Sequence, residues 1–384
     1  MLSSGRRLRN MKSDNNILKM FESVETEKAH KGYMHSVSKA AVIVVLGLLC
    51  GLKNINQIHR WACDERVRSF LRGLGIKKIP CYYWLTRLVA LMKPESVNQC
   101  FYKWVSSLLP NGVNNLTVAI DGKSIRSTMK EESSKSPLHI VSAHIGELKM
   151  TLAQKAVEDK SNEIPAVQEL LKELKLDGCI VVADAMHCQK ETARLIVEGK
   201  ADYLLNAKNN QKLLCEEIKD YVQNEHLRQE MDKEQITEKN RNRLECRTAY
   251  STTDIDWMAC KKDWANLKCI GAICSKSTRA DVTTEEWHYY ISSHKLSAKE
   301  LLRIARLEWS VETMHWLLDV NYGEDFCRLA SERSQKTLNI LRKTAINLLR
   351  RYKEQTGSKK AFTGIMFDCL MNPQHMLSIL NLKP

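Results

Sequence analysis

Three acidic side chains stand out because of the segments that carry them. Asp121 and Asp184 each follow a short apolar run, and Glu312 lies within a stretch of helical spacing. Short apolar runs predict strands, and sites on α/β sheets usually lie where strands end. Taken alone, either aspartate is explained at least as well as a polar cap after a strand. If the three carboxylates converge, they would suit a two-metal site for phosphoryl transfer.

The stretch around Glu312 distributes its acids unusually. At about 100° per residue, two apolar stripes run along it, one formed by Leu307, Val311, Met314 and Leu318 and the other by Leu302, Ala305, Trp309 and Trp316. Three acids and a histidine fall between these stripes: Glu308, Glu312, His315 and Asp319. Acids flanked by packing surfaces need compensation, either from Mg²⁺ or from Lys and Arg of neighbouring helices. Metal binding and ion pairing both remain open for these acids, and ion pairing with Lys or Arg is the stronger expectation for Glu308 and Asp319.

Other polar side chains near the three acids are possible auxiliaries. His187 and His315 could move protons or contact phosphate, although buried structural histidines are commoner. Lys123 and Arg126 follow Asp121 closely enough to be phosphate contacts, with plain surface charge as the alternative. Trp309 and Trp316 have the spacing of packing residues rather than of a DNA contact.

The surrounding pattern predicts a mixed sheet whose first strands are antiparallel. Strands are expected at residues 116–120, 138–144, 150–157, 179–183 and 203–207. Helices are expected at 165–174 and 189–198, and a long one at 298–320, begun by a capping box of Ser297 and Glu300. A last helix is expected at 335–352. Between them, the charged segment 216–247 and strand-like pieces at 267–274 and 287–292 indicate an insertion.

The N-terminal part is predicted to be helical, because apolar residues in 33–109 recur with helical periodicity and show little of the alternation typical of strands. The most apolar run, residues 40–52, is too short for the roughly 20 residues that cross a bilayer and predicts a buried helix. The first 16 residues are polar, with Arg6, Arg7 and Arg9, and suggest a loose arm.

Composition narrows the class of partner. The chain has 384 residues with 59 Lys+Arg against 45 Asp+Glu, a net charge of +14, which suits a polyanion such as DNA without identifying one. Its 13 cysteines contain no C-x-x-C pair, which disfavours a zinc ribbon or a disulfide framework and favours a reducing cytoplasm.

Several motifs, in order, resemble the DDE transposases of bacterial insertion sequences, specifically the ISAs-one type that includes the H-repeat-associated proteins. They are AIDGKSIR (119–126), KSNEIPA (160–166), DAMHCQKE (184–191), DYLLNAKNNQ (202–211), YYISS (289–293) and EWSVETMHWLLDV with GEDFCR (308–328). The chain departs from the usual family pattern at Glu308, Thr313 and His187, but keeps every core acid.

The resemblance implies an α/β, RNase H-like catalytic core with a β-rich insertion, preceded by a small all-helical domain. The expected boundaries are a basic flexible arm at 1–30, a helical and DNA-binding domain at 31–110, a catalytic domain at 111–210 and 294–352, an insertion at 211–293 with a β-rich second half, and a C-terminal tail at 353–384.

The resemblance also implies the site. Asp121, Asp184 and Glu312 would be catalytic and would bind two Mg²⁺ ions, which Mn²⁺ can replace. The expected DNA contacts are Lys123, Arg126, Lys160 and Lys208, and the auxiliary residues are Glu308, His187, His315 and Asp319. The partners would be terminal inverted repeats and target DNA, bound by a homo-oligomer in the bacterial cytoplasm and on the nucleoid.

Two other readings remain open from the sequence. One is a non-mobile nuclease or recombination factor that uses the same acids without joining ends. The other is a DNA-binding protein whose acids are structural and paired with Lys or Arg.

Overall fold

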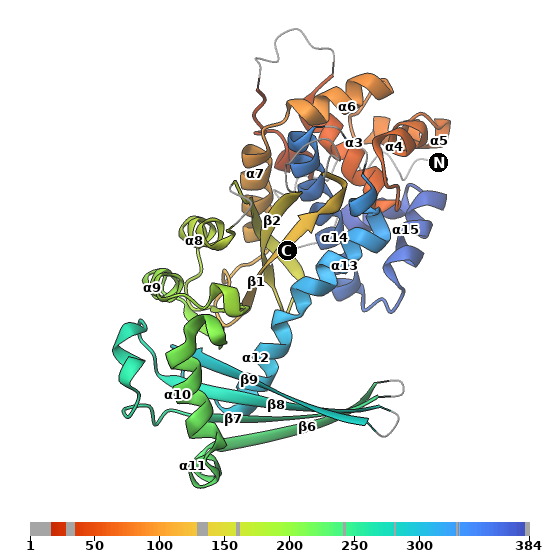
Figure 1. Ribbon diagram of the computed structural model, residues 1–384. Coiled ribbons are helices and arrows are strands. Elements are labelled where there is room, and N and C mark those ends of the chain that lie inside the picture. Colours follow the sequence, from red (N-terminus) through yellow and green to blue (C-terminus); the bar gives the residue numbers. More distant parts are fainter. Residues whose placement is uncertain are drawn as a thin grey trace.

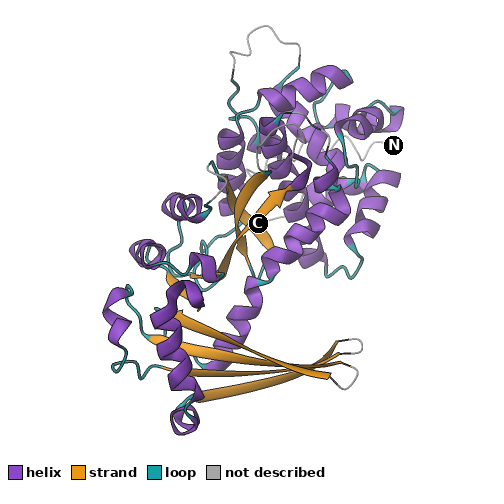
Figure 2. Ribbon diagram, viewed as in Figure 1, coloured by secondary structure: helices purple, strands orange, loops and turns teal. Residues whose placement is uncertain are grey.

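The strands of the protein form one mixed sheet that runs through two differently shaped regions (Figures 1 and 2). The computed structural model describes residues 17–27, 35–128, 137–158, 162–240, 243–279, 282–327, 329 and 331–380. Within these residues the sheet has nine strands in the order β3-β2-β1-β4-β5-β9-β8-β7-β6.

The first five strands follow the sequence expectation closely. β1 (Thr117–Ile125), β2 (Leu138–Ile145) and β3 (Met150–Ala156) form an antiparallel meander. β4 (Ile180–Ala183) and β5 (Asp202–Ala207) then run parallel to β1. α8 (Ile164–Glu173) and α9 (Lys190–Glu198) connect them, as predicted. An antiparallel meander continued by parallel strands and flanked by helices is the predicted RNase H-like core, which is confirmed.

The expected insertion extends this sheet instead of forming a separate one. After α10 (Lys212–Gln223) and α11 (Glu225–Glu230), β6 (Asp232–Asn240), β7 (Arg243–Thr252), β8 (Cys269–Arg279) and β9 (Val282–Ser292) form an antiparallel ribbon. β9 pairs with β5 and thereby joins the ribbon to the core. Strand structure therefore begins earlier than the apolar pieces at 267–274 suggested. β6 has no apolar alternation, and ion pairs such as Glu238 with Arg247 and Arg306 cross its surface.

The predicted long helix at 298–320 is wrong in one respect, because it is two helices. α12 (Ala298–Glu308) begins with the predicted capping box, and α13 (Ser310–Tyr322) follows after Trp309. The hydroxyl of Ser310 donates a hydrogen bond to the carbonyl of Leu307 at 2.5 Å, a local bond that bends helices. The break changes the phase of the helix, so the predicted apolar stripe through Trp309 and Trp316 does not persist.

A helical region precedes the sheet in sequence and packs against the end of the chain. It comprises α2 (Ile17–Met20), α3 (Val37–Leu49), α4 (Ile55–Ala62), α5 (Glu65–Gly73), α6 (Tyr82–Leu91) and α7 (Pro94–Ser107). The apolar run at 40–52 forms most of α3, which is buried as predicted. Among the described helices, none is long and apolar enough to cross a bilayer.

The predicted helix at 335–352 extends further in both directions, as α14 (Glu332–Thr356). α14 contacts α3, α6 and α7 as well as β3, and so ties the helical region to the sheet. The C-terminal segment carries α15 (Phe362–Met371) and α16 (His375–Leu380), and α16 packs on α14. Figure 1 shows these helices on the opposite side of β1 and β2 from α8 and α9.

Candidate active site

Asp121 and Asp184 lie next to one another on two parallel strands. The pairing of β1 with β4 ends with Ile120 opposite Ala183, and the two aspartates are the next residues on each strand. Asp184 ends its strand as predicted, but Asp121 lies inside β1, which continues to Ile125 because it remains paired with β2. The two carboxylates therefore meet at the carboxyl end of the β1–β4 pair.

Glu312 joins them from the first turn of α13, a helix that packs on β1. Burial raises the pKa of Asp121 to about 6, against the hydrogen bond from the Gly122 N–H. The neighbouring charges that help to raise the pKa of Asp121 belong to Asp184, Glu163 and Glu312. The fold thus brings the three predicted acids together at one edge.

Glu308, at the end of α12, belongs to the same acidic group. Burial and the charges of Asp184, Asp121 and Glu312 together raise its pKa to about 7, while Lys208 opposes them. No Lys or Arg among the described residues forms an ion pair with Glu308. The expected pairing of this acid is therefore absent from the described part of the chain, and Glu308 stands beside Glu312 as a potential ligand.

A small cavity of about 160 Å³ opens between these acids and the ribbon. Asp184, Lys208, Glu308 and Trp309 line it, together with Arg247 of β7. Lys208 is exposed there, as a phosphate contact would have to be.

His315 contacts Asp121 from α13, with Nδ1 3.4 Å from a carboxylate oxygen. Burial, with a contribution from nearby Lys343 and Lys123, lowers the pKa of His315 to about 2. The ring is therefore neutral, and it can orient Asp121 but not neutralise it.

Lys123, a predicted DNA contact, and Asp319, a predicted auxiliary residue, form an ion pair with one another. Nζ of Lys123 lies 2.8 Å from Asp319 and 3.5 Å from Glu324 and Asp325, with only 12% of the lysine side chain exposed. Lys123 is consequently unavailable to a phosphate in this arrangement, and Asp319 has the structural pairing that was its alternative. Arg126 is 82% exposed and lies 3.8 Å from Asp325. Lys160 lies outside the described residues.

The expected packing of Trp309 and Trp316 is also wrong. Their exposed fractions are 52% and 58%, and the guanidinium of Arg247 lies 5.5 Å from the ring centre of Trp309. Trp309 lines the cavity beside Asp184 and Glu308.

Glu163 and His139 were not predicted, and both lie against Gly122, the residue after Asp121. Glu163 accepts a hydrogen bond from Nε2 of His187 at 3.0 Å and contacts Nε2 of His139. Burial alone would raise the pKa of Glu163, but the hydrogen bonds from the two imidazoles lower it to about 2. The only sequence signal was its place in the KSNEIPA segment, where an acid at a helix start has an ordinary explanation.

The donor set fits Mg²⁺ or Mn²⁺. The described residues contain no ready-made group of three His, Cys, Asp or Glu side chains that could hold a metal alone. Mg²⁺, however, is commonly bound by one or two carboxylates and completes its shell with water and phosphate oxygens. Burial is the main cause of the raised pKa values of Asp121 and Glu308, and the charges of neighbouring acids add to it; a cation bound among these acids would favour their charged forms.

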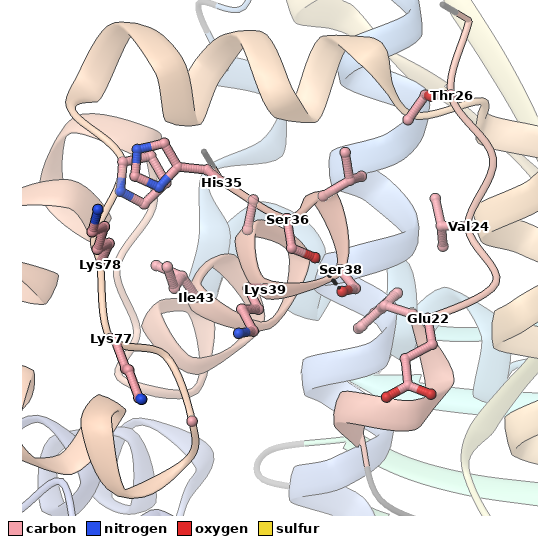
Figure 3. A pocket seen from close by; sticks show the side chains of 15 residues that line it. Glu22, Val24, Thr26, His35, Ser36, Ser38, Lys39, Ile43, Lys77 and Lys78 are labelled. Carbon is pink, nitrogen blue, oxygen red and sulfur yellow. Dashed lines mark hydrogen bonds between the residues drawn. The ribbon is translucent and has the colours of Figure 1, made fainter. Parts of the chain in front are cut away.

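A larger cleft, of about 780 Å³, lies in the helical region and shares no lining residue with the acids. Figure 3 shows Lys39, Lys77 and Lys78 around it, with Glu22 on the opposite wall. Its lining contains three lysines and one glutamate, unlike the acid-rich site on the sheet.

Sequence comparison matches each of the two regions to a family model. Residues 115–348 match the family described as Transposase DDE domain, and residues 18–105 match the DDE_Tnp_1-associated family. The chain is 30% identical over 335 residues to the putative transposase YncI of Escherichia coli O157:H7, covering 85% of each chain. It is 28% identical over 328 residues to the H repeat-associated putative transposase YhhI of Escherichia coli K12, covering 82% of this chain and 85% of that one.

A solved piggyBac transposase synaptic complex with hairpin DNA aligns over 92% of this chain and 75% of that chain, at 10% identity and a TM-score of 0.49. The family match alone covers more than half of the chain. The chain therefore belongs to the DDE transposase family.

Proposed function

We propose that the protein is the transposase of an insertion sequence, which cleaves the ends of its element and joins them to target DNA by in-line phosphoryl transfer. The observation that carries this proposal is the meeting of Asp121, Asp184 and Glu312 at one sheet edge, where no Lys or Arg of the described chain forms an ion pair with them. Family membership supplies the reaction class.

Each residue of the site has a distinct part in this proposal. Asp121, Asp184 and Glu312 would hold two Mg²⁺ ions, which when bound activate water or a 3′-hydroxyl and stabilise the leaving oxygen. His315, neutral and 3.4 Å from Asp121, orients that carboxylate. Lys208 offers an exposed ammonium beside the acids for a backbone phosphate.

The helical region is suited to bind the element ends. Between α4 and α6 it exposes six cations and two aromatic rings: Arg60, Arg66, Arg68, Arg72, Lys77, Lys78, Tyr82 and Tyr83. Cations at this density favour a phosphate backbone, and exposed tyrosines add stacking or hydrogen-bonding groups. We infer that terminal repeats bind here and that the acids act on DNA held in this way by a homo-oligomer.

A strand-transfer assay tests the function. Labelled element ends should be cleaved and joined to target DNA when the protein is supplied with Mg²⁺ or Mn²⁺. Asp121→Ala and Glu312→Gln should abolish both products while DNA binding is retained. Glu191→Gln is a matched control, because this exposed acid pairs with Arg194 on α9. Unchanged cleavage in the two site variants would overturn the assignment.

The rival reading of a non-mobile nuclease makes a different prediction for the same assay. Such an enzyme would release cleaved DNA without joined product, and inverted repeats would not flank its gene. Sequencing a few dozen base pairs on each side of the reading frame decides between the two.

A further inference from the structure

Glu163 links two parts of the fold that meet beside the acids. It lies directly before α8, and only 8% of the residue is exposed. One carboxylate oxygen accepts the hydrogen bond from His187, which belongs to the short turn after Asp184. The other oxygen contacts His139 on β2, the antiparallel partner of β1. One carboxylate therefore connects the segment that carries Asp184 to the strand pair that carries Asp121.

The backbone of β1 is shaped to admit this arrangement. A Cβ atom at position 122 would collide with Glu163 and with the ring of His139, so glycine is needed there. Oγ of Ser124 lies 2.8 Å from Nδ1 of His139 and holds the ring from its other side. Gly122 directly follows Asp121, so the contact forms one residue away from the proposed metal ligand.

We propose that Glu163 is a positioning residue that sets the separation of Asp121 and Asp184 for metal binding. The inference rests on the proposed function, since it concerns the same carboxylates. Imidazole nitrogens engage both oxygens of Glu163, so it acts through His139 and His187 and is not itself a ligand.

The two imidazoles also keep Glu163 charged, because their hydrogen bonds lower its pKa to about 2 in spite of burial. The negative charge of Glu163 repels the charged form of Asp121 and raises the pKa of Asp121. A cation bound to Asp121 would offset this repulsion. Glu163 thus favours cation binding in two ways, by geometry and by charge.

Glu163→Gln separates this role from a purely structural one. Glutamine keeps the size of the side chain but replaces one acceptor with an N–H₂ group, which opposes one of the imidazole N–H donors. Loss of groups that orient metal ligands costs about 10- to 100-fold in metal affinity or activity. The Mn²⁺ concentration for half-maximal cleavage should rise by about that factor. The same shift should appear in Mn²⁺-dependent thermal stabilisation of the full chain without DNA.

Glu147→Gln is the matched control. Glu147 accepts hydrogen bonds from the N–H and hydroxyl of Thr117 and from Arg303, and so anchors the same strand at its other end. Its loss should lower the melting temperature but leave the Mn²⁺ midpoint unchanged. Gly122→Ala is a second probe, because its methyl group displaces Glu163 and His139, and it should shift the midpoint in the same direction as Glu163→Gln.

The outcomes separate the two proposals. A raised midpoint in Glu163→Gln and Gly122→Ala, but not in Glu147→Gln, supports positioning. A wild-type midpoint in the first two variants, or an equal shift in Glu147→Gln, overturns it. Cleavage that survives Asp121→Ala refutes the proposed function instead, whatever Glu163→Gln does.

Discussion

Two groups of carboxylates lie beside the same strand, β1, and differ in what balances their charge. The unbalanced group consists of Asp121, Asp184, Glu308 and Glu312. The paired group consists of Asp319, Glu324 and Asp325, all three within 3.5 Å of Lys123 Nζ. In the described chain, the only ion-pair contacts of the unbalanced group are with histidines, whereas Glu324 also receives hydrogen bonds from Asn339 and Arg342.

The difference teaches that the position of an acid on a helix says less about its role than its compensation does. Glu312 and Asp319 lie on the same helix, and both fell in one acidic stripe of the sequence. A buried charge must be balanced, and the fold balances the paired group with its own cations. In the unbalanced group Asp121 and Glu308 are half-buried, whereas Asp184 and Glu312 are exposed. The need for an external cation, which in a DDE transposase we infer to be divalent metal, therefore comes mainly from Asp121 and Glu308.

The largest expected effect follows from removing a member of the unbalanced group. Asp121→Asn should reduce cleavage at least about a thousand-fold, since metal catalysis contributes several kcal/mol of barrier lowering. Because one repelling charge is gone, the metal-free melting temperature should not fall. Cleavage of labelled ends and thermal unfolding in EDTA measure the two quantities. A large loss of stability in EDTA would show that Asp121 belongs with the structural acids.

Glu324→Gln should have the opposite profile. The side chains of Glu324 and Arg342 are 0% and 1% exposed and lie 3.1 Å apart. Breaking a buried pair on one side costs about 3–5 kcal/mol, because the other charge stays buried. Denaturant unfolding should show this loss, while the folded fraction keeps its wild-type Mn²⁺ dependence. A shift of that dependence without loss of stability would erase the distinction between the two groups.

Glu308→Gln tests membership within the unbalanced group. The pKa of Glu308 is raised to about 7, so this carboxyl is partly protonated near neutral pH and glutamine resembles that state. Cleavage should stay within about tenfold of wild type, the lower end for groups that support a metal site. Glu312→Gln should instead match Asp121→Asn. If the two glutamate variants exchange these results, Glu308 is the third acid.

The pH dependence of stability has a definite sign for this group. Asp121 and Glu308 have raised pKa values of about 6 and 7, so the folded state binds more protons than the unfolded state above about pH 4. Their contribution to stability therefore falls as pH rises from about 4 to 7 and is constant above that. Buried His315 and His144, with pKa values lowered to about 2 and 3, act with the opposite sign below about pH 6.5.

The useful measurement is therefore a difference between proteins. Unfolding of wild type and of Asp121→Asn/Glu308→Gln should be compared at pH 5 and pH 8 in EDTA. The double variant should gain stability relative to wild type at pH 8 but little at pH 5. Mg²⁺ should stabilise wild type more at pH 8. Equal differences at both pH values would contradict the raised pKa values.

The sequence predicted the core strands well because each is an apolar run. The pattern also placed Asp121 and Asp184 after strands, but the choice of Glu312 as the third acid rested on the family resemblance. β6 was not predicted because its sequence has no apolar alternation. Its backbone pairs with β7, and its side chains form ion pairs such as that of Glu238 with Arg306. The break at Trp309 depends on a local Ser310 hydrogen bond that periodicity does not encode. Lys123 pairing with Asp319, 196 residues away, and Glu163 joining two histidines, are contacts that only the folded chain defines.

The smallest expected effect compares two lysines that the sequence treated alike as DNA contacts. Lys208 is exposed beside the unbalanced group, and Lys123 is enclosed by the paired group. If Lys208 neutralises one phosphate, Lys208→Ala should reduce the slope of log K against log salt by about 0.9, whatever the DNA sequence. Lys123→Met should leave that slope unchanged and lower the melting temperature, because it deprives three carboxylates of their shared cation. Fluorescence anisotropy at several salt concentrations measures the slopes. A reduced slope in Lys123→Met would mean that Lys123 leaves the paired group and contacts a phosphate when DNA binds. The ion pairs seen in the free protein would then no longer distinguish structural acids from functional ones.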